Sequence, residues 1–311
     1  TADSIDPTPP ATPSEPRTLQ CPEMRIVITG GNGQLGRSLQ RALAAHEVVA
    51  FAHKELDITD GRAVDAALAA QHPRAVIHAA ALTDTARCER ETEAARAING
   101  GGTENVAKAC QRVGARLVAV STNEVFDGSQ TVAYTENAPT EPLNAYAISK
   151  LDGERLAAAA CADTLIVRTS WLYGDGGNNF VEKVRAAASS GRKLSFVTDE
   201  VASPTSTEDL AVAIRELIER DAPAGIYHLA NSGEASRYDW ALEILRLSGM
   251  SEAPVEQVTT EQLRANGYDG PRKPPYSVLA NTRAAALGVT MRPWQDALTA
   301  YFERSRVAAD A

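Results

Sequence analysis

Tyr146 and Lys150, four residues apart in Tyr-Ala-Ile-Ser-Lys, form the pair in this chain whose spacing most directly suggests chemistry. An alanine-rich stretch follows them and predicts a helix, in which residues i and i+4 share one face. A nearby ammonium favours the phenolate and lowers the tyrosine pKa, so Tyr146 can exchange a proton with a carbonyl or an alcohol. The pattern occurs often by chance, so its meaning depends on the segments around it.

A second group of polar residues follows directly after the apolar run at residues 117–120. It consists of Ser121, Thr122, Asn123 and Glu124. If the run is a buried strand, Thr122 and Glu124 leave its end on the same face, because strand side chains alternate. Two interpretations stay open here. The hydroxyl and the carboxylate are both directed at a substrate, or they are the polar start of a loop.

The glycines Gly30, Gly33 and Gly36 lie between an apolar run at residues 25–29 and a stretch with a leucine every four residues. Glycines at such a strand-to-helix turn let the backbone approach a pyrophosphate, which then lies at the helix N-terminus. We therefore predict a dinucleotide site. No acid follows the next apolar run, where His53 and Lys54 stand instead and can meet a 2′-phosphate. This favours NADPH and leaves NADH possible, although a solvated lysine explains the same residues.

Apolar runs alternate with alanine-rich helical segments from residue 24 onward, which predicts an α/β fold. We expect a Rossmann-like, doubly wound parallel sheet with a smaller mixed α/β C-terminal lobe. Residues 1–23 are expected to be a disordered tail, 24–173 the dinucleotide-binding domain with 199–230 returning to it, and 174–311 mainly a substrate-binding lobe. Thr205 and Glu208 resemble a capping box before a helix at residues 209–220.

Composition excludes several classes of protein. A net charge of −9 argues against a nucleic-acid partner or an anionic membrane. No apolar stretch has the length of a membrane helix, and the histidines show no metal-ligand spacing, so we expect neither a membrane nor a metal partner. The four cysteines are scattered, which is typical of reduced thiols in a cytoplasmic protein. Nothing here fixes the oligomeric state, and a homodimer is possible.

Taken together, these motifs resemble the extended short-chain dehydrogenase/reductase family, and more closely its dTDP-4-dehydrorhamnose reductase branch. The resemblance covers residues 25 to about 300 and rests on the glycine loop, on Pro-Leu-Asn-Ala-Tyr-Ala-Ile-Ser-Lys at 142–150 and on later motifs. Among these, Arg-Thr-Ser-Trp at 168–171 and Ser-Pro-Thr at 203–205 are particularly characteristic of the branch.

The resemblance implies NAD(P)H-dependent reduction of the C4 keto group of a nucleotide-linked 4-keto-6-deoxysugar, with dTDP-4-dehydro-L-rhamnose as the expected substrate. By position, the implied catalytic residues are Thr122, Tyr146 and Lys150, with Tyr146 and Lys150 also touching the cofactor. The other implied cofactor contacts are Gly30, Gly33, Gln34, Leu35, Asp57, Ile58, Ala79, Ala80, Ala81 and Thr83. The implied substrate contacts are Asn123, Glu124, Trp171 and Asn179.

Two departures from the branch concern the substrate. The branch usually has Ser-Thr-Asp-Tyr where this chain has Ser-Thr-Asn-Glu, so Asn123 and Glu124 replace its acid and its tyrosine. The branch also has Val-Asp-Lys where this chain has Thr-Ala-Arg at 85–87. Thr-x-Glu also resembles nucleotide-sugar 4,6-dehydratases, in which a carboxylate removes water across C5–C6. A third hypothesis is a non-catalytic, NADP-binding regulatory subunit, although such a module has no need of the intact Thr122, Tyr146 and Lys150.

Overall fold

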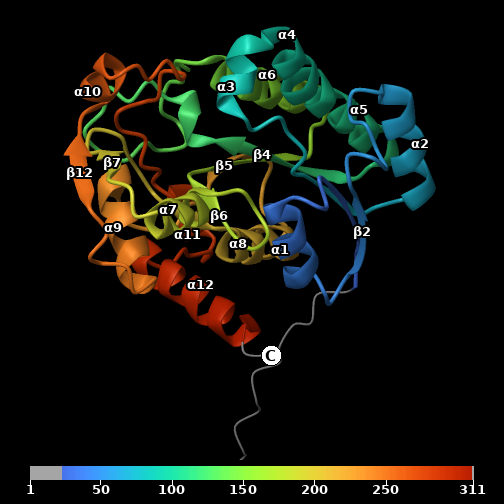
Figure 1. Cartoon of the computed structure of the whole chain (residues 1–311). Coiled ribbons are helices and arrows are strands. Elements are labelled where there is room, and N and C mark those ends of the chain that lie inside the picture. Colours follow the sequence, from blue (N-terminus) through green and yellow to red (C-terminus); the bar gives the residue numbers. More distant parts are fainter. Residues whose placement is uncertain (1–22, 310–311) are drawn as a thin grey trace, which may run out of the picture.

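A six-stranded parallel sheet forms the centre of the chain in this computed structural model, which describes residues 23–309 (Figure 1). Its strand order is β10-β5-β4-β3-β1-β2, and every neighbouring pair is parallel. The strands are β1 (Arg25–Thr29), β2 (Glu47–Phe51), β3 (Ala75–His78), β4 (Arg116–Thr122), β5 (Thr164–Thr169) and β10 (Gly225–His228). The predicted Rossmann-like sheet is confirmed, because right-handed crossovers between such strands place helices on both faces.

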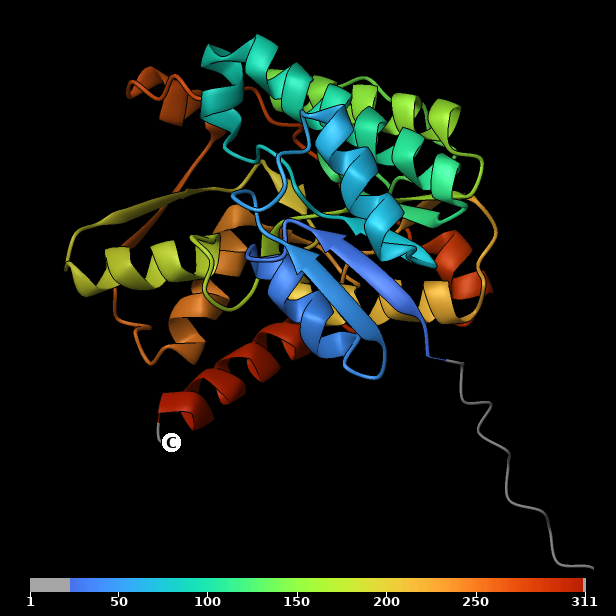
Figure 2. The same ribbon diagram turned by 90° about the vertical axis from the view of Figure 1, so that its right-hand side faces the viewer.

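Two helical layers cover the sheet, as both views of the ribbon show (Figures 1 and 2). On one face lie α2 (Gly61–Gln71), α5 (Thr103–Val113) and α6 (Ala145–Ala160), and on the other α1 (Gln34–Ala42), α8 (Thr207–Glu219) and α11 (Thr282–Ala286). Leucines spaced four apart, Leu35, Leu39 and Leu43, give α1 an apolar stripe that is buried against the sheet and α8. Short segments α3 (Thr85–Arg90), α4 (Thr92–Ala95) and the π-helical turn η1 (Arg96–Gly102) precede α5.

The remaining elements lie beside the carboxyl ends of the strands, and several of them share a second core. They are η2 (Asn123–Val125), β6 (Leu172–Tyr173), α7 (Phe180–Ser189), β7 (Leu194–Val197), β8 (Val201–Ala202), β9 (Thr205–Ser206), β11 (Ala235–Ser236), α9 (Arg237–Leu247), β12 (Val255–Val258), α10 (Thr260–Ala265) and α12 (Trp294–Ala309). Aromatic side chains dominate this core: Tyr173, Trp240, Tyr301 and Phe302 pack between α7, α9 and α12. Stacked and edge-on rings of this kind add to the free energy of burial.

The return of later residues to the sheet follows from two contacts. Strand β10 pairs with β5, and α8 packs along α1. The predicted capping box at Thr205 is wrong, because the N-cap of α8 is Ser206, whose hydroxyl accepts from the Glu208 amide, while the Thr205 hydroxyl donates to the Ser203 carbonyl. The predicted tail at residues 1–23 lies outside the described residues except for Glu23. No helix within residues 23–309 has the length and hydropathy needed to cross a membrane.

Candidate active site

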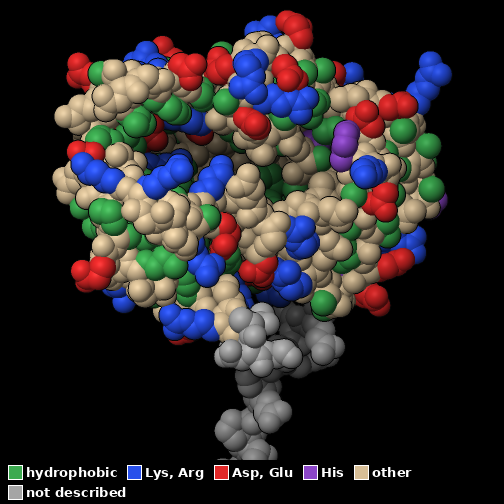
Figure 3. Space-filling model, viewed as in Figure 1, with side chains coloured by type: hydrophobic (Ala, Val, Ile, Leu, Met, Phe, Trp, Pro, Cys, Tyr) green, Lys and Arg blue, Asp and Glu red, His purple; other side chains and the backbone are tan. Residues whose placement is uncertain are grey.

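One cavity of about 810 Å³ opens at the carboxyl ends of the parallel strands, between the sheet and the second core. Ligands of open α/β sheets bind at this edge, because the loops that follow the strands leave a crevice there. A hollow bordered by several Lys and Arg side chains is visible on this face of the molecule (Figure 3). Every site residue predicted from the sequence lines the cavity: Gly30, Gly33, Gln34, Leu35, Asp57, Ile58, Ala79, Ala80, Ala81, Thr83, Thr122, Asn123, Glu124, Tyr146, Lys150, Trp171 and Asn179.

The glycine loop at one end of the cavity has a shape that only glycine permits. Gly30 has φ +76°, and a Cβ there would stand 2.8 Å from the Ala80 nitrogen. A Cβ at Gly36 would meet the Gly30 carbonyl oxygen at 2.3 Å. Both positions therefore exclude larger residues, so no side chain at these positions covers the loop backbone on its cavity side.

The N-terminus of α1 is open toward the same space. Its N-cap, Gly33, provides no side-chain hydrogen bond to the first turn, and that turn holds no acidic residue. Free amides at a helix N-terminus attract a phosphate group, since the helix dipole favours a negative charge there. Asp57 also lines the cavity, and its pKa is lowered because the amide and hydroxyl of Thr59 both donate to its carboxylate. The geometry fits a dinucleotide.

Tyr146 and Lys150 lie on the first two turns of α6, beside the end of β4, where Thr122 is the last strand residue. The helix begins here because Asn144 is its N-cap, with the side-chain oxygen accepting from the Ala147 amide at 2.9 Å. The Lys150 ammonium donates to the Val120 carbonyl at 2.7 Å. Burial lowers the pKa of Lys150 to about 8, although the charge of Glu154 opposes this shift.

The pKa of Tyr146 differs from the sequence prediction. The helical spacing predicts that Lys150 lowers it, but in this structure the pKa of Tyr146 is raised, first by burial and then by the negative charge of Glu124. The Thr122 hydroxyl acts in the opposite direction. A raised pKa keeps the phenol protonated at neutral pH, which is the form that can donate a proton to an oxyanion.

Two further residues of the cavity had no role in the sequence prediction. Arg237 lies over Trp171, with its guanidinium carbon 3.5 Å from the ring centroid, and Lys183 of α7 lines the same cavity. The nearest carboxylate to Arg237 is that of Glu200, 3.8 Å from Nε. The sequence gives no signal for either cation, because α7 and α9 come together only in the folded chain.

A third residue, Asn99, connects two parts of the site from the π-helical turn η1. Its side-chain oxygen accepts from the Leu82 amide at 2.8 Å, and its nitrogen donates to the Ser149 hydroxyl at 2.9 Å. Ser149 in turn donates to the Tyr146 carbonyl at 2.7 Å. Asn99 thus ties the loop after β3 to the helix of Tyr146.

Comparison with known proteins places this site in a family. The sequence model of one protein family, the RmlD substrate binding domain, matches residues 24–307. The chain is 40% identical over 288 residues to the spore coat polysaccharide biosynthesis protein SpsK of Bacillus subtilis, a match that covers 92% of this chain and 99% of the relative. It is 39% identical over 289 residues to the dTDP-4-dehydrorhamnose reductase of Streptomyces griseus, which covers 90% and 94% of the two chains.

A solved structure gives the same result. The crystal structure of dTDP-4-dehydrorhamnose reductase from Bacillus anthracis in complex with NADP superposes with a TM-score of 0.86 at 36% identity, and the match covers 91% of this chain and 99% of that one. Since the family model and these relatives each span nearly all of residues 24–307, the chain belongs to the RmlD substrate binding domain family, the dTDP-4-dehydrorhamnose reductase branch of the extended short-chain dehydrogenases/reductases.

Proposed function

We propose that the protein uses NADPH to reduce the C4 keto group of a nucleotide-linked 4-keto-6-deoxysugar, and that its substrate is dTDP-4-dehydro-L-rhamnose, which becomes dTDP-L-rhamnose. One observation carries the proposal: Thr122, Tyr146 and Lys150 meet in the cavity that also holds the bare glycine loop. The names of the relatives, which include a dTDP-4-keto-6-deoxy-D-glucose reductase at 36% identity, support the same chemistry.

The proposed mechanism assigns one task to each side chain. Tyr146 donates its phenolic proton to the C4 oxygen as negative charge develops there, and the Thr122 hydroxyl donates a hydrogen bond to the same oxygen. The ammonium of Lys150 stabilises the tyrosinate that results. NADPH, when bound, supplies the hydride. The open N-terminus of α1, the glycine loop and Asp57 would hold that cofactor.

The two other functions considered from the sequence fit less well. A 4,6-dehydratase would need Glu124 free to act as a base, but both oxygens of this carboxylate accept from Lys273. A regulatory NADP-binding subunit would have no use for a Tyr146, Lys150 and Thr122 arrangement that faces an open cavity. The reductase uses all of these features.

Cofactor preference can be tested at His53, which lines the cavity beyond the end of β2, where an acid would select NADH. In His53→Asp, the new carboxylate repels a 2′-phosphate and can accept from a ribose hydroxyl. We expect the ratio of kcat/KM for NADPH over NADH to fall about tenfold or more. His72→Asp, at the far end of α2, is the control. An unchanged ratio in His53→Asp would place the 2′-phosphate elsewhere.

The diphosphate of the substrate also needs a binding partner, and the cavity supplies positive charge in a chain whose net charge is −9. Of its Lys and Arg side chains, Lys150 donates to the Val120 carbonyl and Arg87 pairs closely with Glu91 at 2.8 Å. Lys183 lines the cavity, and Arg237 has only a long contact of 3.8 Å with Glu200. We assign the diphosphate to these two. The planar guanidinium of Arg237 offers paired donors to phosphate oxygens while its face stays on Trp171.

Arg237→Gln is expected to raise KM for the nucleotide sugar about tenfold or more, because a charge-assisted pair of hydrogen bonds is lost. KM for NADPH should not change. Arg246→Gln, on the exposed side of the same helix, provides the matched control. Steady-state kinetics with each substrate varied in turn measures both constants. Equal changes in the two KM values would show that Arg237 does not contact the diphosphate.

The proposed reaction itself is tested by two parallel assays. In the first, dTDP-4-keto-6-deoxyglucose is supplied with a 3,5-epimerase and NADPH, and oxidation of NADPH at 340 nm is followed. In the second, dTDP-glucose is supplied with NAD⁺. Oxidation in the first assay supports the reductase, whereas keto-sugar formation in the second alone would show a dehydratase.

The setting of the enzyme is part of the proposal. We propose that it acts in the cytoplasm as a homodimer, with residues 174–311 as its substrate lobe apart from the 199–230 segment. Cys88, Cys110 and Cys161 are buried free thiols, which supports a reducing compartment.

A further inference from the structure

Glu124, the residue that replaces a tyrosine of the branch, is fully occupied by neighbours from two distant segments. The Lys273 ammonium donates to its two oxygens at 2.7 and 2.9 Å, and the Asn144 side chain donates to Oε2 at 2.8 Å. The side chains of Glu124 and Lys273 are only 12% and 17% exposed. Removal of either partner of such a buried pair strongly destabilises the fold, because the other charge stays buried without a counter-charge.

Asn144 connects this pair to the catalytic helix. It is the N-cap of α6, two residues before Tyr146, and its side-chain nitrogen donates both to Glu124 and to the Arg272 carbonyl, the latter at 2.9 Å. Its side-chain oxygen meanwhile caps the Ala147 amide. The first turn of α6 is therefore tied to the end of β4 and to the segment around Lys273 by one side chain.

Asn123 makes a second attachment to the same segment. Its side-chain nitrogen donates to the Ser277 hydroxyl at 2.7 Å, and Asn123 is 2% exposed. Residues 267–275 form no helix or strand and contain Gly267, Gly270 and three prolines. The backbone of residues 275–277 pairs with Val201, where the Val201 amide donates to the Pro275 carbonyl and the Ser277 amide to the Val201 carbonyl. The attachments at Lys273 and Ser277 add side-chain contacts to this pairing and join the segment to the end of β4.

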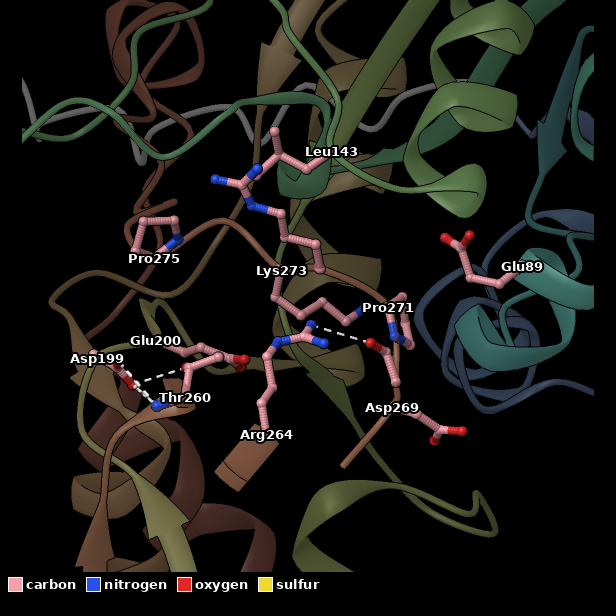
Figure 4. A pocket seen from close by; sticks show the side chains of 12 residues that line it. Glu89, Leu143, Asp199, Glu200, Thr260, Arg264, Asp269, Pro271, Lys273 and Pro275 are labelled. Carbon is pink, nitrogen blue, oxygen red and sulfur yellow. Dashed lines mark hydrogen bonds between the residues drawn. The ribbon is translucent and has the colours of Figure 1, made fainter. Parts of the chain in front are cut away.

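The held segment forms a wall of a second cavity, of about 600 Å³ (Figure 4). Lys273 and Pro271 lie in the middle of this view, between Glu89 on one side and the pair Asp199 and Glu200 on the other. Lys273 lines this cavity, whereas Glu124 lines the active-site cavity. The ion pair therefore stands between the two spaces.

We propose that Asn123 and Glu124 are positioning residues, which fasten residues 272–277 against the start of the Tyr146 helix and so fix the proton donor relative to the sugar. Neither residue carries out acid–base chemistry. This role rests on the proposed function, since it concerns the placement of Tyr146 toward a substrate carbonyl.

The groups that face Glu124 separate the effects of two variants. Lys273 faces the carboxylate from the side of the second cavity, and Asn144 faces it from the start of α6. Glu124→Gln keeps the length of the side chain but removes the charge that binds Lys273. Lys273→Met removes the cation and leaves the hydrogen bond from Asn144 to Glu124 in place.

The decisive experiment is a double-mutant cycle with Glu124→Gln, Lys273→Met and the two combined. We expect each single change to raise KM for the nucleotide sugar or to lower kcat about tenfold, and the double variant to be no worse than either single one. The exchanged pair, Glu124→Lys with Lys273→Glu, should recover part of the loss. Lys193→Met, which breaks an exposed Lys–Glu pair, is the control and should have no effect.

Amide hydrogen exchange of the full-length protein without ligands gives a readout that does not depend on the reaction. Residues 267–277 should exchange faster in Glu124→Gln and in Lys273→Met than in the wild type or in Lys193→Met. Unchanged exchange, or losses in the two single variants that add up in the double variant, would overturn the positioning role. If the wild type fails to oxidise NADPH with the sugar while exchange responds as expected, the proposed function fails and the attachment stands.

Discussion

Tyr146→Phe is expected to lower kcat for reduction of the 4-keto sugar about 10³-fold, because a proton donor in the transition state contributes 10² to 10⁴ in rate. The variant loses one hydroxyl and keeps the ring, which packs beside Cys88 and Ala145. The affinity for NADPH should stay within about twofold, since the glycine loop, the α1 N-terminus and Lys150 are untouched. Single-turnover rates together with fluorescence titration of NADPH measure the two effects separately.

Tyr238→Phe serves as the control for this change, because Tyr238 lies on α9 outside both cavities. It should turn over at the wild-type rate. A Tyr146→Phe enzyme that retained more than about a tenth of wild-type kcat would mean that another group protonates the oxygen. Thr122, whose hydroxyl acts on the Tyr146 phenol, would then be the first candidate.

The fold could be predicted from the sequence because its elements have strong local signals. Buried parallel strands appear as continuous apolar runs, and β1, β3 and β5 are of this kind. The glycines after β1 predicted a tight turn, and the leucines along α1 predicted that a helix follows this turn. The end of α8 was also foreseen, but its start was not, because Ser206 and Thr205 have equally good capping side chains and only the backbone distinguishes them.

The candidate site could be predicted where the chemistry is local and not where it depends on distant contacts. Tyr146 and Lys150 share a helix, so their spacing predicts that they lie together, and the resemblance to the family implied that Thr122 joins them in one cavity. Spacing also put Glu124 on the face of Thr122, but it could not reveal that Lys273, 149 residues later, binds the carboxylate. The cations Lys183 and Arg237 were missed for the same reason.

The direction of the Tyr146 pKa shows how burial can reverse a local argument. A lysine four residues away favours the phenolate, yet the ring is enclosed and lies near the negative charge of Glu124. Desolvation of the phenolate is the larger effect, and it depends on the whole cavity wall, which no short sequence motif describes. The Lys150 ammonium also donates to the Val120 carbonyl, a contact that the helical spacing alone does not contain.

The buried ammonium of Lys150 lowers the stability of the folded protein. Its pKa of about 8, against 10.5 in an unfolded chain, corresponds to roughly 3 kcal/mol of destabilisation when the ammonium is buried at neutral pH. The Lys150 side chain is buried and its one hydrogen-bond acceptor among the described residues is the Val120 carbonyl. Active sites commonly keep such charges at the expense of stability.

Lys150→Met is therefore expected to lower kcat about 10²-fold or more and at the same time to raise the melting temperature at pH 7. The rate falls because the tyrosinate formed at Tyr146 loses its cation. Between pH 8 and 10.5, Lys150 is protonated in the unfolded wild type but has lost its proton in the folded protein. The free energy of unfolding of the wild type therefore rises with pH over this range. Lys150→Met has no such group, so its stability does not rise for this reason. The difference in melting temperature should shrink from pH 8 upward. A variant that is less stable than wild type at pH 7, with no convergence at higher pH, would show that Lys150 is not held against a desolvation cost.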